Sequence, residues 1–208
     1  MIAIVAYGLG NVQAIANIYK RLNVEARLVS TPEELRAADR IILPGVGSFD
    51  WAMEALARSG LRETLDELVM GERRSVLGIC VGMQMMAHKS EEGTSAGLGW
   101  IDAEVKRLPR ADGLMLPHMG WNDVTARAAS PLLKGFEKDA RFYFLHSYYF
   151  APREDSVTIA TAEYGRPFAC AVQSGNVYGA QFHPEKSHGW GIRLLQNFAS
   201  LGETPKLK

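Results

Sequence analysis

Strand-like apolar runs alternate with helical stretches in the first part of the chain, and this alternation constrains the fold more than any other feature. Residues 2–6 form a continuous apolar run rich in β-branched side chains, which is typical of a strand buried on both faces. Apolar residues recur at helical spacing over 11–22, and further strands are predicted at 27–30, 40–43 and 76–79 with helical stretches between them. This alternation, with short loops, predicts a doubly wound and mostly parallel sheet with helices on both faces.

The second part of the chain differs because strand-like segments dominate it. They are predicted at 100–105, 141–146, 157–162, 168–173 and 176–182. Helices are predicted at 81–88 and, after the last strand, at 189–201, whereas 202–208 has the composition of a tail. We therefore expect an α/β fold in which antiparallel strands extend a mostly parallel central sheet.

Composition favours one soluble domain. The 208 residues suffice for a single unit spanning 1–208, and 23 basic and 23 acidic side chains cancel, which disfavours a generally basic nucleic-acid binder or a polybasic membrane protein. No apolar stretch approaches the length of a membrane span, and the first residues lack the basic region of a signal peptide. Cys80 and Cys170 alone cannot build a disulfide framework, so we expect a cytoplasmic protein with neither nucleic acid nor membrane as partner.

Three glycine-rich loops follow predicted strands, where open parallel sheets bind their ligands. They are Gly8-Leu9-Gly10, Pro44-Gly45-Val46-Gly47 and Gly78-Ile79-Cys80-Val81-Gly82. In the first, Gln13 stands where a dinucleotide-binding fingerprint needs its third glycine, and no glycine in the chain precedes a lysine, as a phosphate-binding P-loop requires. We therefore expect no nucleotide cofactor.

The third loop carries the strongest signal for chemistry. Gly-x-Cys-x-Gly between a strand and a helix is the cysteine form of the nucleophile elbow, in which flanking glycines let the backbone turn sharply around the nucleophile. A helix beginning at Val81 would also turn its positive end toward Cys80 and favour the thiolate. The alternative is that Cys80 is a small buried apolar residue, as free cysteines often are. The elbow alone does not separate the two.

A histidine with an orienting partner lies later in the chain. Of the five histidines, His183 directly follows a predicted strand, and Pro184 after it favours an extended backbone. Residues two apart in an extended chain point the same way, so Glu185 can accept a hydrogen bond from the imidazole and fix its tautomer. Cys80, His183 and Glu185 thus have the residue types of a nucleophile, a base and an orienting acid. An exposed turn without chemistry would have the same local sequence.

The remaining candidates favour structural roles. The aromatic residues of 142–144 and 148–150 alternate as in a half-buried strand, which favours core packing. Cys170 lies in an apolar run that favours the same. The histidines that lack the spacing of metal ligands are His88, His118 and His188. No metal site is therefore expected.

These motifs together resemble the triad-type, or class I, glutamine amidotransferases. Three separated blocks carry the resemblance: Pro44-Gly45-Val46-Gly47, Gly78-Ile79-Cys80-Val81-Gly82-Met83-Gln84 and Gln181-Phe182-His183-Pro184-Glu185-Lys186-Ser187. The resemblance implies a flavodoxin-like doubly wound fold and L-glutamine as substrate, with no cofactor. One departure is Ala6, where the family commonly has an acidic residue before the first glycine loop.

The resemblance also implies a reaction and the residues that perform it. Cys80 would attack the side-chain amide of glutamine, ammonia would leave, and water would release glutamate from a thioester. His183 would move the protons, first as general base and then as general acid, with Glu185 orienting it. The residues implied for the oxyanion and for substrate binding are Val46, Gly47, Val81, Gln84, Ser147 and Tyr148.

Further blocks resemble one branch of the family, the glutaminase subunits of imidazole glycerol phosphate synthases. They are Tyr7-Gly8-Leu9-Gly10-Asn11, Pro117-His118-Met119-Gly120-Trp121-Asn122 and Phe144-Leu145-His146-Ser147-Tyr148-Tyr149. This branch implies a heterodimer with a separate synthase (cyclase) subunit, contacted through Trp121 and Lys186 and supplied with ammonia for histidine biosynthesis. Because the resemblance uses nearly every segment, we expect the ammonia acceptor to be held by that other chain.

Three alternatives stay open at this point. Similar blocks occur in paralogous subunits that supply ammonia for amidination of a surface-polysaccharide sugar, and the shared triad does not separate the two pathways. A related cysteine hydrolase of γ-glutamyl compounds is disfavoured by the block at 117–122. A catalytically silent flavodoxin-like interaction module is disfavoured by Gln84 and the complete triad.

Overall fold

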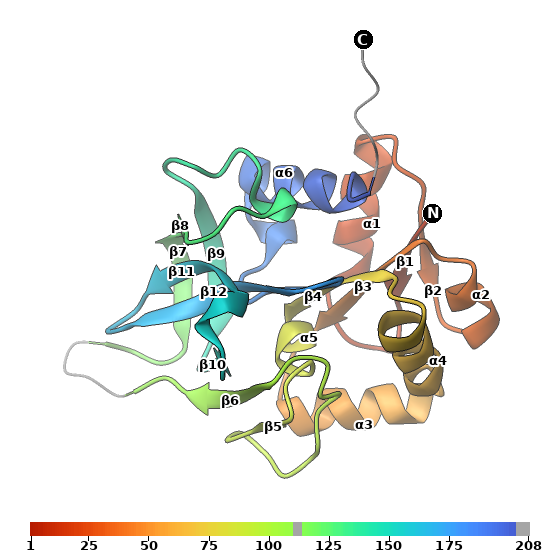
Figure 1. The fold of residues 1–208 in the computed structure, drawn as a ribbon, viewed down its shortest axis with the longest axis horizontal. Coiled ribbons are helices and arrows are strands. Elements are labelled where there is room, and N and C mark those ends of the chain that lie inside the picture. Colours follow the sequence, from red (N-terminus) through yellow and green to blue (C-terminus); the bar gives the residue numbers. More distant parts are fainter. Residues whose placement is uncertain (110–113, 203–208) are drawn as a thin grey trace.

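The computed structural model describes residues 1–109 and 114–202 and contains a central mixed sheet (Figure 1). The parallel part of this sheet follows the order β2-β1-β3-β4-β13. The bounds of these strands, in that order, are Ala26–Val29, Ile2–Val5, Arg40–Gly45, Ser75–Cys80 and Val177–Ala180. The three central strands β1, β3 and β4 are almost entirely buried, as continuous apolar runs predict for strands covered on both faces.

Beyond β13 the sheet continues mainly with antiparallel strands and ends at the short strand β5, which pairs parallel with β6. Strand β12 pairs antiparallel with β13, β10 and β11, and β10 pairs antiparallel with β6. The bounds are β5 (Lys89–Ser90), β6 (Ala103–Arg107), β8 (Thr125–Ala126), β10 (Tyr148–Pro152), β11 (Thr158–Glu163) and β12 (Pro167–Ser174). A separate two-stranded sheet pairs β7 (His118–Asp123) with β9 (Arg141–His146). The predicted α/β fold, mostly parallel with added antiparallel strands, is confirmed.

Helices cover both faces of the parallel part. In Figure 1, α1 and α6 lie on one side of the sheet and α3 and α5 on the other. The bounds are α1 (Val12–Arg21), α2 (Pro32–Arg36), α3 (Phe49–Ser59), α4 (Arg62–Asp66), α5 (Val81–Gln84) and α6 (His188–Ala199). Short 3₁₀ or π turns occupy Glu67–Gly71, Pro131–Leu133, Asp155–Val157 and Pro184–Lys186. Among the described residues, no helix has the length and apolar character needed to cross a membrane.

Two boundaries differ from the prediction for a shared reason. The helix predicted at 81–88 ends at Gln84, because the carbonyl groups of the next turn accept hydrogen bonds from Leu98 and Ile101. The same hydrogen bonds hold residues 98–101 against this turn and not in the sheet. The strand predicted at 100–105 therefore starts later, as β6 at Ala103. The tail predicted at the C-terminus lies, beyond its first residue, outside the described residues.

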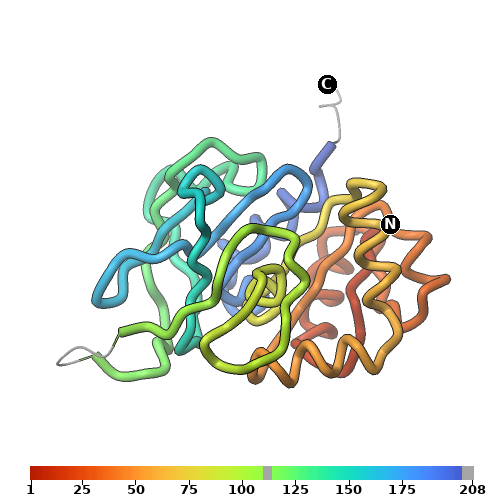
Figure 2. Tube along the Cα trace, turned by 60° about the horizontal axis from the view of Figure 1, so that its bottom comes forward, coloured from red at the N-terminus to blue at the C-terminus, as the bar shows by residue number. Residues whose placement is uncertain are grey.

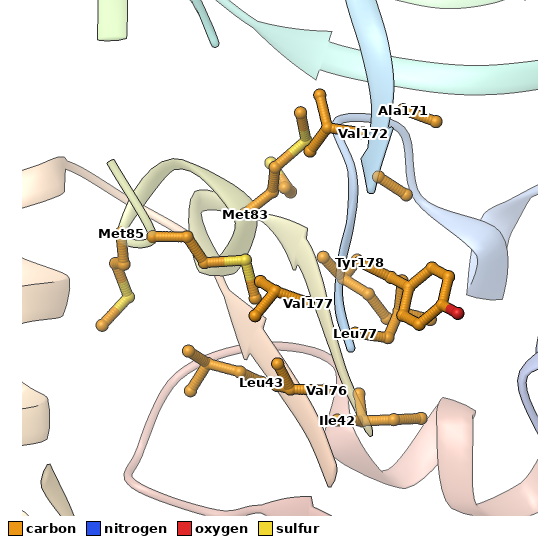
Figure 3. Close-up of a cluster of buried hydrophobic side chains, with 14 of the residues drawn as sticks. Ile42, Leu43, Val76, Leu77, Met83, Met85, Ala171, Val172, Val177 and Tyr178 are labelled. Atoms are coloured by element: carbon orange, nitrogen blue, oxygen red, sulfur yellow. The ribbon is translucent and has the colours of Figure 1, made fainter. Parts of the chain in front are cut away.

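One hydrophobic core connects the two parts of the sheet. Figure 3 shows one cluster of this core, which includes Met83 and Val172. Both side chains pack over Gly179, whose missing side chain leaves them room. The buried aromatic residues of the two predicted runs are Phe142, Phe144, Tyr149 and Phe150. Cys170 is fully buried, which raises the pKa of its thiol, as expected of a core residue. In Figure 2 the red-to-yellow and green-to-blue parts lie side by side, joined where β4 pairs with β13.

Candidate active site

Cys80 ends strand β4 in a strained backbone conformation, with φ of 56° and ψ of −115°. Residues other than glycine rarely adopt positive φ, so the surrounding structure must hold Cys80 there. The flanking glycines allow the sharp turn. A Cβ at Gly78 would lie 2.7 Å from the Gly82 carbonyl oxygen, and a Cβ at Gly82 would overlap the Leu43 carbonyl. The backbone therefore has the geometry of a nucleophile elbow.

The Cys80 thiol is turned toward the second half of the chain. Its Sγ lies 3.9 Å from the carbonyl oxygen of Leu145 and 3.8 Å from Nε2 of Gln181. Cys80 and His183 line the same cavity, and Cys80 raises the pKa of the His183 imidazole. Pairing of β4 with β13 makes this approach possible, because each of these neighbouring parallel strands ends at the same edge of the sheet.

His183 follows β13 with an extended backbone, as Pro184 predicts. Its Nδ1 lies 3.0 Å from Oε1 of Glu185, and both side chains are almost entirely buried. Because the carboxylate accepts this bond, Nε2 of the imidazole is left to face Cys80. Burial alone lowers the pKa of His183, but hydrogen bonds to Cys80 and Glu185 and the charges of both raise it from 6.5 to about 10. The site therefore favours the protonated form of His183.

A cavity of about 320 Å³ opens beside the thiol and the imidazole. The predicted site residues that line it are Val46, Gly47, Cys80, Val81, Gln84, Ser147, Tyr148, His183 and Lys186. The structure thus brings together residues from both halves of the chain. Glu185 lies outside the lining, behind His183, and Trp121 lines a different hollow.

The loop after β3 presses against the elbow. Strand pairing sets Gly45 opposite Cys80, so Val46 and Gly47 follow at the level of Cys80. A Cβ at Gly45 would lie 2.9 Å from the Val81 carbonyl carbon, so only glycine permits this approach. Gly47 itself has φ of +87°, a value that favours glycine. The loop therefore reaches the cavity next to the start of α5.

Tyr7 holds the end of β3, which leads into this loop, by a hydrogen bond. The hydroxyl of Tyr7 donates a hydrogen bond to the Pro44 carbonyl at 2.7 Å, and its side chain is buried. Burial raises the pKa of Tyr7 well above its ordinary value, as does the nearby charge of Cys80. Tyr7, the residue before the first glycine loop, thus supports the second glycine loop.

Gln84 lies on the helix after the elbow and is almost fully buried. Its amide nitrogen donates to the Tyr148 carbonyl at 3.1 Å and to Oε1 of Gln181 at 3.0 Å. Gln181 in turn lies beside the Cys80 sulfur. Gln84 therefore joins the elbow to the backbone segment predicted to hold substrate.

Four residues at this site were not predicted from the sequence. Glu92 lines the cavity, and its Oε2 accepts a hydrogen bond from the Phe49 backbone N–H at 2.8 Å. Gln181 begins the motif that contains His183, but the sequence predicts no role for it at the site. His118 and His146 form a buried pair beside the cavity. The inward alternation of 141–146 was the available signal for His146, since it places that side chain on the same face as the buried phenylalanines.

The two residues predicted to face a partner lie at the surface. Lys186 is exposed at the rim of the cavity, with its ammonium 5.7 Å from the centre of the Tyr143 ring. Trp121 is 41% exposed and stacks on His188 with ring centres 5.4 Å apart. Within the described ranges, no group of three or more His, Cys, Asp and Glu side chains is arranged to hold a metal ion.

Comparison with known families decides what this arrangement belongs to. The sequence profile described as "Glutamine amidotransferase class-I" matches residues 3–200. The chain belongs to the class I glutamine amidotransferases. As an amidotransferase of this class it is an enzyme, and its mixed sheet, elbow and cavity are features of the matched part of the chain.

Relatives of this amidotransferase are similar over nearly all of its length. A protein of Bdellovibrio bacteriovorus named imidazole glycerol phosphate synthase subunit HisH is 53% identical, covering 97% of this chain and 100% of that protein. A Leptospira interrogans protein of the same name is 52% identical with the same coverage. A solved structure titled as a glutamine amidotransferase shares the fold, with a TM-score of 0.73 at 21% identity over 96% of this chain and 99% of that one.

Proposed function

We propose that the chain is the glutaminase subunit of an imidazole glycerol phosphate synthase. It would hydrolyse L-glutamine and pass ammonia to a separate cyclase subunit. The single observation that carries the proposal is the buried Cys80–His183–Glu185 arrangement, found in a class I amidotransferase with relatives of that name above 50% identity. The shared core of the described residues supports one amidotransferase domain over 1–208.

Acylation begins at the cysteine–histidine pair. The Cys80 thiolate attacks the side-chain amide carbon of glutamine, and the C–N bond breaks as His183 gives its proton to the departing nitrogen. Ammonia leaves and a thioester joins the glutamyl group to Cys80. His183 then takes a proton from water, hydroxide attacks the thioester, and glutamate leaves as the sulfur is restored. Glu185 holds the imidazole in one orientation throughout.

The oxyanion formed in both steps needs donors. The backbone N–H of Val81, directly after the nucleophile, and an N–H of the Val46–Gly47 turn border the same cavity. We assign both to the oxyanion, for which loss of one donor costs roughly 10²–10³ in rate. The approach of Gly45 to the elbow supports this assignment because it brings the turn next to Val81.

The other end of glutamine is an amino acid, with one ammonium and one carboxylate. The backbone of Ser147 and Tyr148 borders the cavity and would hold this end, with Gln84 supporting it from behind. Glu92 places a carboxylate in the same cavity, where it complements the α-ammonium group. These contacts select an amino acid with a free α-amino group and an amide side chain.

The partner would cover the face that carries Lys186 and Trp121. A cyclase docked there would close the cavity rim and receive ammonia before it reaches water. The proposed reaction uses no cofactor. Two free, buried cysteines support a location in the cytoplasm.

Glutamate release from glutamine tests the proposal, measured with and without the candidate cyclase and its ribonucleotide substrate. We expect turnover to rise when cyclase and ribonucleotide are both present. Unchanged turnover together with stimulation by a sugar-modifying synthase would assign the chain to polysaccharide amidination. High turnover without any partner would indicate a stand-alone hydrolase, and background turnover in every mixture would indicate a silent module.

A further inference from the structure

Two buried histidines lie beside the candidate active site without a part in the triad. His118 of β7 and His146 of β9 are paired directly by the register of the two-stranded sheet. Nδ1 of His118 lies 2.9 Å from Nε2 of His146, and both rings are buried. Burying polar groups is costly unless their hydrogen bonds are satisfied, so their partners identify what the pair does.

These partners fix the direction of every hydrogen bond. Nδ1 of His146 lies 2.8 Å from the Tyr148 carbonyl, which can only accept, so Nδ1 carries the proton and Nε2 accepts. His118 must then donate from Nδ1, while its Nε2 accepts from the Asn122 amide at 3.2 Å. The second hydrogen of that amide bonds to the Glu163 carbonyl at 2.8 Å. The bonds therefore run one way, from Asn122 to Tyr148.

The surroundings keep both imidazoles neutral. Phe144 and Tyr164 stack on the His118 ring with centres 4.8 and 4.1 Å away, and burial lowers the pKa of His118 to about 4. Burial also lowers the pKa of His146 to about 3, although the bond to Tyr148 favours its charged form. An imidazolium has protons on both nitrogens and cannot accept, so neutrality preserves the chain of bonds.

This chain of hydrogen bonds ends at Tyr148, in a segment that borders the cavity. The Tyr148 carbonyl accepts a second hydrogen bond from Gln84, so both of its lone pairs are occupied. Because the peptide group is planar, fixing this carbonyl fixes the Tyr148–Tyr149 peptide and with it the Cα atom of Tyr148. The preceding peptide is held from its own side, since the Ser147 carbonyl accepts a hydrogen bond from the Leu108 backbone N–H at 2.9 Å. A segment ordered in advance makes glutamine binding more favourable, since no ordering entropy is lost on binding.

We propose that Asn122, His118 and His146 are positioning residues that hold the 147–148 segment in its glutamine-binding conformation. This role rests on the glutaminase function proposed above. The chain of bonds begins on β7, the strand that also carries the exposed Trp121. Any protein bound to that strand therefore contacts the outer end of a network whose inner end borders the substrate cavity.

Glutamine hydrolysis by the complex with its cyclase tests this role, with kcat and KM for glutamine measured separately. His118→Phe keeps a stacked ring but interrupts the chain of hydrogen bonds. We expect the KM for glutamine to rise about fivefold, which is the effect of one lost hydrogen bond. The value of kcat should stay within about twofold of wild type. His118→Asn places an amide nitrogen close to the position of Nδ1. It restores the bond to His146 but not the bond from Asn122, so KM should fall part of the way back toward the wild-type value. His88→Phe, which removes an exposed histidine outside the site, is the matched control and should leave KM unchanged.

Two results would overturn the role: an unchanged KM in His118→Phe, or a raised KM that His118→Asn does not lower. A lowered melting temperature with a lowered kcat alone would indicate a merely structural contribution. Nitrogen-15 spectra of the histidine side chains give a second measurement that does not depend on activity. We expect Nδ1–H tautomers for His118 and His146. An Nε2–H tautomer at His146 would contradict the proposed direction of the hydrogen bonds. Wild-type protein without glutamine hydrolysis would refute the proposed function while the spectra still decide the direction of the bonds.

Discussion

The two halves of the candidate active site are held in place by different means. In the first half, backbone conformation positions Cys80, and the missing side chains of Gly78 and Gly82 let neighbouring main chain approach it. In the second half, side chains position His183. Its ring is held by Glu185, and the Ser187 hydroxyl donates to its carbonyl at 2.6 Å.

This contrast predicts how each half should fail. Main chain packed against a glycine leaves no room for one more carbon atom, so changes there should act first on stability. Hydrogen bonds between side chains can be lost without added bulk, so changes there should act first on rate and on pH dependence. Substitutions in the two halves therefore separate the two kinds of positioning.

The largest expected effect comes from Cys80→Ala, which removes the proposed nucleophile and keeps the strained backbone. Glutamine-dependent turnover should fall by at least about 10⁴-fold, as for other nucleophiles of triads. Synthesis from added ammonium salt should be spared, because the acceptor site lies on the partner in our proposal. Both activities are measured in the reconstituted complex, and an equal loss of both would indicate misfolding or a shared site.

Gly82→Ala tests the backbone half. The new Cβ would overlap the Leu43 carbonyl, and we expect the free energy of unfolding to fall by about 3 kcal/mol. Urea denaturation followed by circular dichroism measures this. Gly189→Ala is the matched control, since a Cβ there meets no atom within 4 Å. Equal stability of the two variants would show that the elbow has more space than its backbone indicates.

Glu185→Gln tests the side-chain half. Glutamine keeps the size and an acceptor oxygen but removes the charge that favours the imidazolium of His183. We expect kcat/KM to fall by about 10²-fold in a protein that still folds, less than for Cys80→Ala because Cys80 is retained. A loss as large as that of Cys80→Ala, in a folded protein, would show that orientation matters as much as nucleophilicity.

The histidines of the second half should give opposite pH dependences of stability. The folded-state pKa of His183 is raised to about 10, so its stabilising contribution is fully present below pH 6.5 and lost as the pH rises toward 10. The pKa values of His118 and His146 are lowered to about 4 and 3, so their contribution is present above pH 6.5 and lost as the pH falls. Urea denaturation at a series of pH values measures the free energy of unfolding. We expect His118→Phe to reduce its pH dependence on the acid side, and Cys80→Ala to reduce it on the alkaline side. The reverse assignment would contradict a charged His183 and a neutral histidine pair.

The catalytic candidates were predictable from sequence because each motif is local. Glycines on both sides of Cys80 specify the elbow within five residues, and the His-Pro-Glu order places Glu185 on the side of His183 that it contacts. The alternation of strands and helices likewise specified the parallel part of the sheet. Resemblance to a family then connected motifs that local patterns could not bring together.

The histidine pair was not predictable by the same means. His118 and His146 meet only through the register of β7 with β9, and β7 itself lacked a clear strand pattern because Gly120 interrupts it. The end of α5 is likewise set by hydrogen bonds from Leu98 and Ile101, far along the chain. Long-range pairing, which local propensity does not encode, decided these features.

The positive φ of Cys80 has a consequence for how this protein can evolve. Holding a non-glycine residue there costs about 1 kcal/mol or more, which glycine would not incur. We therefore expect Cys80→Gly to melt about 2–4 °C above Cys80→Ala in thermal denaturation, although neither variant uses glutamine. A lower melting temperature for the glycine variant would mean that the conformation is not strained. Selection for stability alone would thus replace Cys80, so under our proposal its presence reflects selection for chemistry against the preference of the fold.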